Sequence, residues 1–168
     1  MKTYSNLKMK FLILAVLVAG AYASVSSDEA GLVKSTWAQV KNNEADILYA
    51  VFKAYPDIQA RFPAFVGKDL DSIKGSAAFT MHASRIVALL NQYVGLLGND
   101  AYLPAITTIF SEMGSNHANR GVSKAQFGEF KTALIGYMKG HVSWGANVEH
   151  AWNDAFDQMY GFVFAKLH

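Results

Sequence analysis

Cysteine is absent from the 168-residue chain. Its absence excludes disulfides, a thiol nucleophile, a cysteine-ligated zinc site, and covalent haem attachment through a C-x-x-C-H motif. The fold must therefore be held by its core alone, which a chain of this length can build. Hydrophobic residues make up 52% of the sequence and aromatic residues 13%. This composition predicts one ordered globular domain rather than a disordered chain.

The first part of the chain has the pattern of a secretory signal peptide. Three lysines among the first ten residues form a basic opening, and an apolar run then extends from Phe11 to Ala23. The run ends in overlapping small-x-small patterns, which are typical of signal-peptidase sites. It is shorter than the roughly 20 apolar residues of a membrane-spanning helix. We therefore expect cleavage after Ala21 or Ala23, so that residues 1–23 are removed and residues 24–168 form a secreted domain.

The domain that remains after removal of residues 1–23 has no excess of positive charge. The chain has 15 Lys and Arg against 13 Asp and Glu, but three of the lysines and none of the acids lie in residues 1–23. The remaining domain has 12 basic and 13 acidic residues. Its charge therefore gives no reason to expect binding to nucleic acid or to an anionic membrane.

Strand patterns are scarce, and helical periodicity dominates residues 24–168. Ser26 and Glu29 form a capping-box pattern at the start of the first helix. A long helix is predicted from about Ser76 to Val94, ended by the glycines at 95 and 98, and residues 63–74 are predicted to be an irregular loop. A further helix is predicted to begin near Asn43, and a short one to run from Pro56 towards Phe62. Three more are predicted from the apolar patterns of Ile106–His117, Phe127–His141 and Trp152–Val163. We expect an all-α single domain with six long or medium helices and no internal repeat.

Two histidines, His82 and His117, lie on the apolar faces of consecutive predicted helices. Such helices run antiparallel or crossed, so the two rings can face each other across a gap. By spacing alone, a core histidine bonded to a backbone carbonyl is the more common situation. Neither histidine has a neighbouring Cys or His for a structural zinc site, and no Glu-x-x-His pair for a di-iron site is present. A metal ligand that brings its own four donors, such as haem, needs only one or two histidines.

Further residues lie in register with these two histidines. Trp37 lies in the first predicted helix, and Pro56 precedes two phenylalanines at 62 and 65. His82 follows Phe62 by 20 residues. Five more apolar residues belong to the same pattern: Ile86, Met113, Val122, Phe127 and Phe130. In the spacing of all these residues the chain resembles the globin family over the whole of residues 24–168.

Three stretches are most similar to the extracellular haemoglobins of chironomid midge larvae: Ile47–Ala54, Gly67–Gly75 and Tyr137–His141. The resemblance implies the globin fold, a three-on-three helical sandwich around a haem pocket. The segment between His82 and His117 is longer than in most globins by about a turn and a half of helix. We expect the extra residues around Leu96–Leu103.

The resemblance also implies the site. His117 would be the proximal ligand of haem b iron, with its second ring nitrogen bonded to a carbonyl one turn earlier or to a nearby side chain. His82 would be the distal residue that contacts bound oxygen. Arg85 would pair with a haem propionate or, as the second option, turn inward to the ligand. The other expected haem contacts are Leu48, Phe62, Phe65, Ile86, Met113, Val122, Phe127 and Phe130.

The implied function is reversible binding of dioxygen in haemolymph, without enzymatic activity. The alternatives are a haem enzyme that removes nitric oxide or peroxide, and a cofactor-free carrier of small apolar molecules. Leu48 occupies a position where globins built for chemistry often have tyrosine or glutamine, which favours carriage. Small secreted carriers of apolar molecules usually need disulfides, and this chain has no cysteine to form them. Without cysteine, any assembly is noncovalent, and we expect a monomer or a homodimer.

Overall fold

The computed structural model describes residues 24–167, and within this range the chain is helical with short connections. The predicted signal peptide of residues 1–23 and the C-terminal residue lie outside the described residues. The elements are α2 (Ser27–Val40), α3 (Glu44–Ala54), α4 (Pro56–Ala60), α5 (Leu70–Ile73), α6 (Ala77–Leu96), the 3-10 turn η1 (Asp100–Tyr102), α7 (Leu103–Ala118), α8 (Lys124–Lys139) and α9 (Ala146–Phe164).

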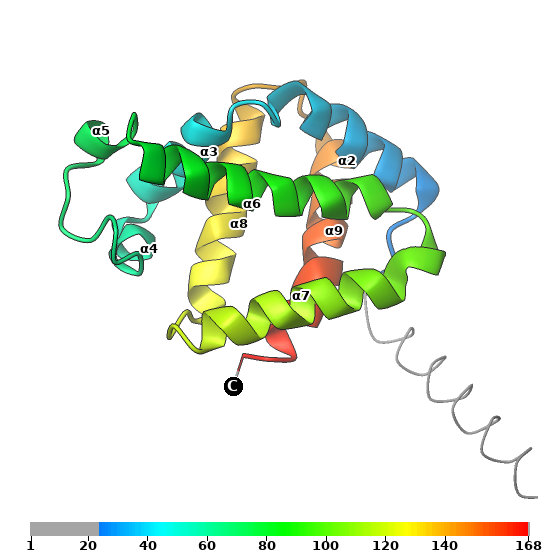
Figure 1. The fold of residues 1–168 in the computed structure, drawn as a ribbon. Helices are drawn as coiled ribbons and strands as arrows, with labels where there is room; N and C mark the ends of the chain where they lie inside the picture. Colours follow the sequence, from blue (N-terminus) through cyan, green and yellow to red (C-terminus); the bar gives the residue numbers. More distant parts are fainter. Residues whose placement is uncertain (1–23, 168) are drawn as a thin grey trace, which may run out of the picture.

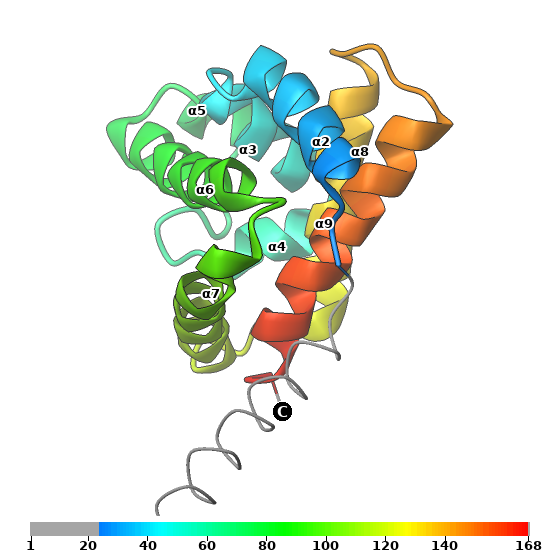
Figure 2. The ribbon, with the colours of Figure 1, turned by 90° about the vertical axis from the view of Figure 1, so that its right-hand side faces the viewer.

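The six longer helices form two crossed layers. Helices α6 and α7 pass across α8 and α9 in Figure 1, and the view turned by 90° separates the same two pairs (Figure 2). Helix α2 packs on α9 and α6, and α3 packs on α6 and α8. The result is the predicted three-on-three sandwich, with α2, α6 and α7 opposite α3, α8 and α9. No helix within residues 24–167 is long and apolar enough to cross a membrane.

Local sequence signals place most of the helix starts. The predicted capping box is confirmed: the Ser26 hydroxyl accepts from the Glu29 amide at 3.3 Å, and the Glu29 carboxylate accepts from the Ser26 amide at 2.8 Å. Ser76 caps α6 in a similar way through the Phe79 amide. Ser123 and Gln126 form a second capping box at the start of α8. Each bond satisfies an amide at a helix terminus that has no partner within the helix.

The structure differs from the sequence prediction at the end of α6 and adds one short helix to the predicted loop. Helix α6 continues through Gly95 to Leu96, because glycine inside a helix costs only about 1 kcal/mol and the flanking Tyr93, Val94 and Leu97 are buried. The predicted irregular loop of residues 63–74 contains the short helix α5. Its start is capped by the Asp69 carboxylate, which accepts from the Ser72 amide at 2.9 Å, and its Ile73 is buried.

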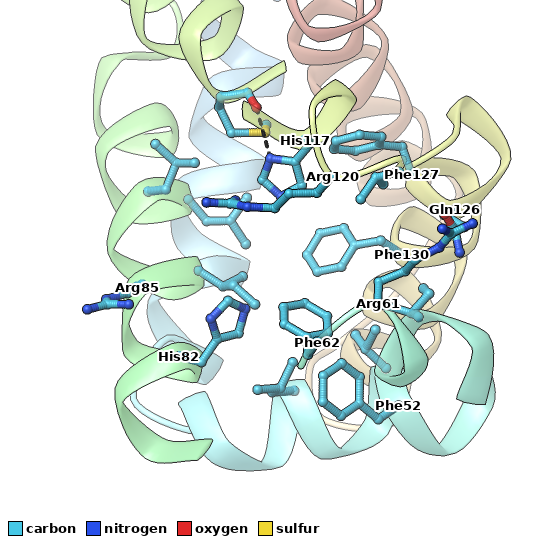
Figure 3. Close-up of a pocket in the computed structure, with 18 of the residues that line it drawn as sticks. Phe52, Arg61, Phe62, His82, Arg85, His117, Arg120, Gln126, Phe127 and Phe130 are labelled. Atoms are coloured by element: carbon cyan, nitrogen blue, oxygen red, sulfur yellow. Dashed lines mark hydrogen bonds between the residues drawn. The ribbon is translucent and has the colours of Figure 1, made fainter. Parts of the chain in front are cut away.

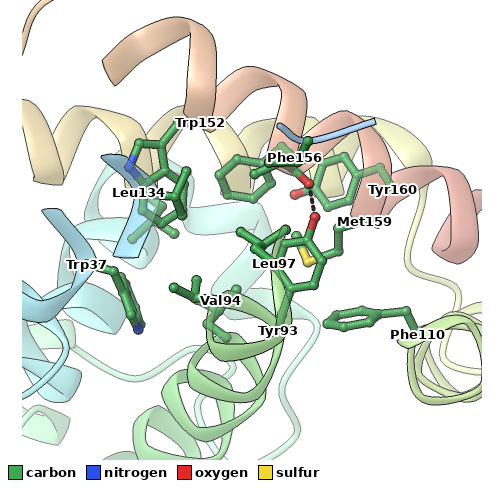
Figure 4. Packing of buried hydrophobic residues seen from close by; sticks show 14 of the residues in the cluster. Trp37, Tyr93, Val94, Leu97, Phe110, Leu134, Trp152, Phe156, Met159 and Tyr160 are labelled. Carbon is green, nitrogen blue, oxygen red and sulfur yellow. Dashed lines mark hydrogen bonds between the residues drawn. The ribbon is translucent and has the colours of Figure 1, made fainter. Parts of the chain in front are cut away.

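The main core lies where α2, α6, α7 and α9 converge (Figure 4). The polar atoms of its large aromatic residues have partners. Trp152 Nε1 donates to Thr36 Oγ1 at 3.0 Å, and the Tyr160 hydroxyl donates to the Phe127 carbonyl at 2.6 Å. The buried Tyr93 hydroxyl donates to the Ala155 carbonyl on α9. These bonds fix α9 against helices of both layers, because a buried polar atom without a partner is costly.

Candidate functional site

A cavity of about 530 Å³ lies between α6 and α7, with α3 and α8 forming its further walls (Figure 3). This volume is in the range of about 300–1,000 Å³ that is typical of ligand and cofactor sites. Its lining is mainly aliphatic and aromatic, with a few polar groups. The expected haem contacts that line it are Leu48, Phe62, His82, Arg85, Ile86, Met113, His117, Val122, Phe127 and Phe130.

Phe65 is the one expected contact that is not part of the lining. It is 3% exposed and packs behind the cavity wall, with ring centroids 5.9 Å from Phe52 and 5.6 Å from Phe79. Its ring centroid is also 5.9 Å from that of Phe62, which does line the cavity. Phe65 therefore supports the wall from behind.

His117 lies one turn after Met113 on α7, and its ring is held in one orientation. Its Nδ1 lies 2.8 Å from the Met113 carbonyl oxygen, so the hydrogen bond expected from the sequence is present. A carbonyl only accepts, so Nδ1 carries the proton and Nε2 keeps its lone pair. The ring also packs against Phe127, with 5.4 Å between centroids. His117 therefore offers one oriented nitrogen donor to a ligand.

His82 approaches the cavity from α6, on the opposite side from His117 (Figure 3). Its ring packs edge-on against Phe62 at 4.5 Å between centroids and lies 6.2 Å from Phe65. The loop that carries both phenylalanines is fixed by the buried Gln59, whose amide donates to the Phe65 carbonyl at 3.0 Å and to the Lys68 carbonyl at 2.9 Å. The orientation of His82 therefore depends on a loop far from it in sequence.

Both histidines favour the neutral imidazole. Burial lowers the pKa of His82, and the nearby charge of Arg85 lowers it further. Burial also lowers the pKa of His117, although the hydrogen bond to Met113 acts in the opposite direction. A neutral imidazole is the form that binds a metal through its lone pair, and it is also a hydrogen-bond donor through its remaining N–H.

Arg85 points away from the cavity (Figure 3). Its guanidinium donates to the Met81 sulfur at 3.6 Å on the exposed face of α6. Arg85 therefore does not turn inward to the ligand, which was the second of the two positions expected for it from the sequence. The arginine still borders the cavity through part of its side chain.

Both the sequence and the fold of this chain are similar to those of known proteins. The globin family model matches residues 45–163. The chain is 56% identical to Globin CTT-Z of Chironomus thummi piger over 155 residues, which is 92% of this chain and 95% of that protein. It is also 56% identical to Globin CTT-VIIB-7 of the same organism over 158 residues, covering 94% of this chain and 98% of the relative. The chain belongs to the globin family.

The fold of this globin is similar to that of a solved haemoglobin. A crystal structure of the haemoglobin component TA-VII from Tokunagayusurika akamusi superposes with a TM-score of 0.85 at 43% identity. The alignment covers 88% of this globin and 99% of the solved chain. In this globin the segment between His82 and His117 consists of the rest of α6, the turn η1 and most of α7.

The cavity of this globin has polar residues that the sequence reasoning missed. Arg61, Arg120 and Gln126 all line it. Arg120 follows His117 by three residues, and Arg61 immediately precedes Phe62. Each therefore lies close in sequence to a residue that was expected to contact haem. Arg61 reaches across to the turn after α7, where a Cβ placed on Gly121 would lie 3.5 Å from its Nη1. Only the packing of α4 beside this turn brings the two arginines to the same cavity.

Proposed function

We propose that this globin binds haem b and carries or stores dioxygen by reversible binding at the ferrous iron. The observation that supports this most strongly is the pair of histidines across one apolar cavity, with Nδ1 of His117 already bonded to the Met113 carbonyl. Such a bond fixes both the tautomer and the direction of the ligating nitrogen. A planar group that supplies four donors of its own would lie between His82 and His117.

The donor set of the cavity fits haem. Nε2 of His117 would be the proximal ligand, and the haem would supply the ferrous iron to which dioxygen binds reversibly. The mainly apolar walls suit a porphyrin ring, and Phe62, Phe127 and Phe130 contribute aromatic surface to them. Arg61 and Arg120 offer positive charge to the two propionates, with Arg85 as a third group beside the cavity. Because the chain has no cysteine, haem held without thioether bonds is the form that we propose.

His82 would tune the affinity for oxygen. Its neutral ring, held against Phe62 at 4.5 Å between centroids, can donate an N–H to dioxygen on the distal side. A hydrogen bond to a partner that carries charge contributes about 1.5–3 kcal/mol, which is roughly ten- to a hundredfold in affinity. The aliphatic groups around it, among them Leu48 and Ile86, limit the access of water. The same Leu48 supports carriage rather than enzymatic removal of nitric oxide or peroxide.

We further propose that the protein acts outside the cell, in haemolymph. The basis is the basic and apolar pattern of residues 1–23, which would be removed after Ala21 or Ala23. The mature protein would be a monomer or a noncovalent homodimer that binds neither nucleic acid nor membrane. Mass analysis of protein recovered from haemolymph would test the cleavage site, and retention of residues 1–23 would contradict it.

The test of the central proposal is an absorption spectrum of the purified protein with and without oxygen. We expect a Soret band that shifts reversibly, since one histidine ligand leaves a coordination position for the gas. His117→Gly should abolish haem retention, whereas His82→Leu should keep haem and release oxygen roughly ten- to a hundredfold faster. Absence of a Soret band after addition of haem would refute haem binding. An unchanged release rate in His82→Leu would refute the distal role alone.

A further inference from the structure

A second cluster of ligand-type side chains lies away from the haem cavity, where the start of α2 meets α9. It consists of Glu29 in the first turn of α2 and of His150 and Asp154 on α9. One ligand atom from each of the three lies within 4.8 Å of the other two. His150 Nε2 is 3.9 Å from Glu29 Oε1, and His150 Nδ1 is 3.5 Å from Asp154 Oδ1. None of the three lines the cavity.

The local structure holds two of these groups in place. Glu29 Oε2 accepts from the Ser26 amide at 2.8 Å and from the Ser26 hydroxyl at 2.6 Å. This capping bond fixes the carboxylate and leaves Oε1 directed to the cluster. His150 and Asp154 are four residues apart on α9, a spacing that puts them on one face of a helix. The Glu29 and Asp154 side chains are 20% and 27% exposed, and that of His150 is 70% exposed. Two shielded carboxylates and one accessible imidazole leave room for water.

No lysine or arginine is paired with the carboxylates of the cluster. Within residues 24–167, the ion pairs of Glu29 and Asp154 are with His150 alone. Two carboxylates and one imidazole therefore lie close together with no lysine or arginine to compete with a bound cation.

We propose that Glu29, His150 and Asp154 bind a divalent transition-metal cation of the zinc type, linking the N-terminal helix to the C-terminal one. Carboxylate oxygen and imidazole nitrogen are both zinc ligands, and three protein ligands with one water complete a tetrahedral set. Calcium and magnesium prefer oxygen ligands only, so the imidazole selects against them. The site shares no residue with the cavity, because His150 and Asp154 precede Met159 and Tyr160, the residues of α9 that line the cavity.

The test is titration of the purified protein with zinc chloride, followed by calorimetry and by thermal unfolding. We expect one zinc ion per chain at this site and, at a zinc concentration about 100 times Kd, a rise in Tm of roughly 5–10 °C. His150→Ala and Asp154→Asn should each weaken binding by roughly tenfold or more. His141→Ala is the matched control. It also removes an exposed histidine, but one that lies just after α8 and outside the cluster, and it should leave zinc binding unchanged. Calcium chloride should leave Tm unchanged.

Three outcomes would overturn the proposal. In the first, zinc binds His150→Ala and Asp154→Asn as tightly as the unaltered protein. In the second, zinc neither binds nor shifts Tm. In the third, calcium shifts Tm as much as zinc does. Asp154→Asn preserves the size of the side chain, and the Soret band and far-ultraviolet circular dichroism of each variant would identify a folding defect separately from a loss of binding.

Discussion

Replacing Gly114 by alanine probes the contact on which the position of His117 depends. Gly114 is buried on α7, three residues before His117, and faces the end of α9. A Cβ added there would lie 2.6 Å from the Val163 carbonyl oxygen and 3.2 Å from both Cα and C of Val163. These are backbone atoms of a packed helix, so α7 and α9 would have to move apart to accept the methyl group.

The expected size of the effect follows from two opposing contributions. Overpacking of this kind costs about 1–3 kcal/mol, whereas alanine in place of a helical glycine gains about 0.5–1 kcal/mol. We expect Gly114→Ala to lower the free energy of unfolding by up to about 2.5 kcal/mol. For a domain of this size the upper value corresponds to a fall in Tm of about 5–10 °C. Because His117 moves with α7, haem should also dissociate faster.

Gly128→Ala is the matched control for this experiment. Gly128 is exposed within α8, and a Cβ there would meet no atom within 4 Å. The same substitution should therefore raise the free energy of unfolding by about 0.5–1 kcal/mol. Thermal unfolding followed by circular dichroism at equal haem saturation measures both. A Gly114→Ala protein as stable as Gly128→Ala would refute the close approach of α7 and α9.

Two further predictions concern buried polar groups. Tyr93→Phe removes the hydroxyl that donates to the Ala155 carbonyl, and urea unfolding should show a loss of about 1–3 kcal/mol because the carbonyl stays buried without this donor; a change near zero would contradict the role of this bond. Glu129 lies beside Asp57, and its pKa is raised above 4.5, first by burial and then by the Asp57 charge. The folded state therefore binds this proton more tightly than the unfolded state, and stability is lost as pH rises above 4.5. Glu129→Gln should raise Tm at pH 7 and leave it unchanged near pH 4, and an equal rise at both values would contradict the argument.

Much of the candidate site could be predicted from sequence because its residues are tied to local patterns. The bond from His117 to the Met113 carbonyl spans one helical turn, so the spacing of the two residues on α7 implied it. His82 and Ile86 share one face of α6 in the same way. The direction of Arg85 was harder to predict, because its long side chain can turn either to the cavity or to the Met81 sulfur.

The limits of sequence reasoning are clearest where a local preference is weak. Gly95 is a poor helix residue, and from sequence it was expected to help end α6. The helix continues past it because Tyr93, Val94 and Leu97 on the same segment are buried in the core. Burial of these side chains outweighs a backbone penalty of about 1 kcal/mol.

The sequence by itself determined the helical class, the capping of α2 by Ser26 and Glu29, and the apolar helix faces on which the two histidines lie. Each of these rests on spacings or interactions within about one turn of helix. Tertiary structure decided which distant residues meet. Trp152 bonds to Thr36 across 116 residues, and His150 and Asp154 reach Glu29 in the same way, through the packing of α9 on α2. Such meetings depend on how two helices cross, and the order of residues along either helix does not specify the crossing.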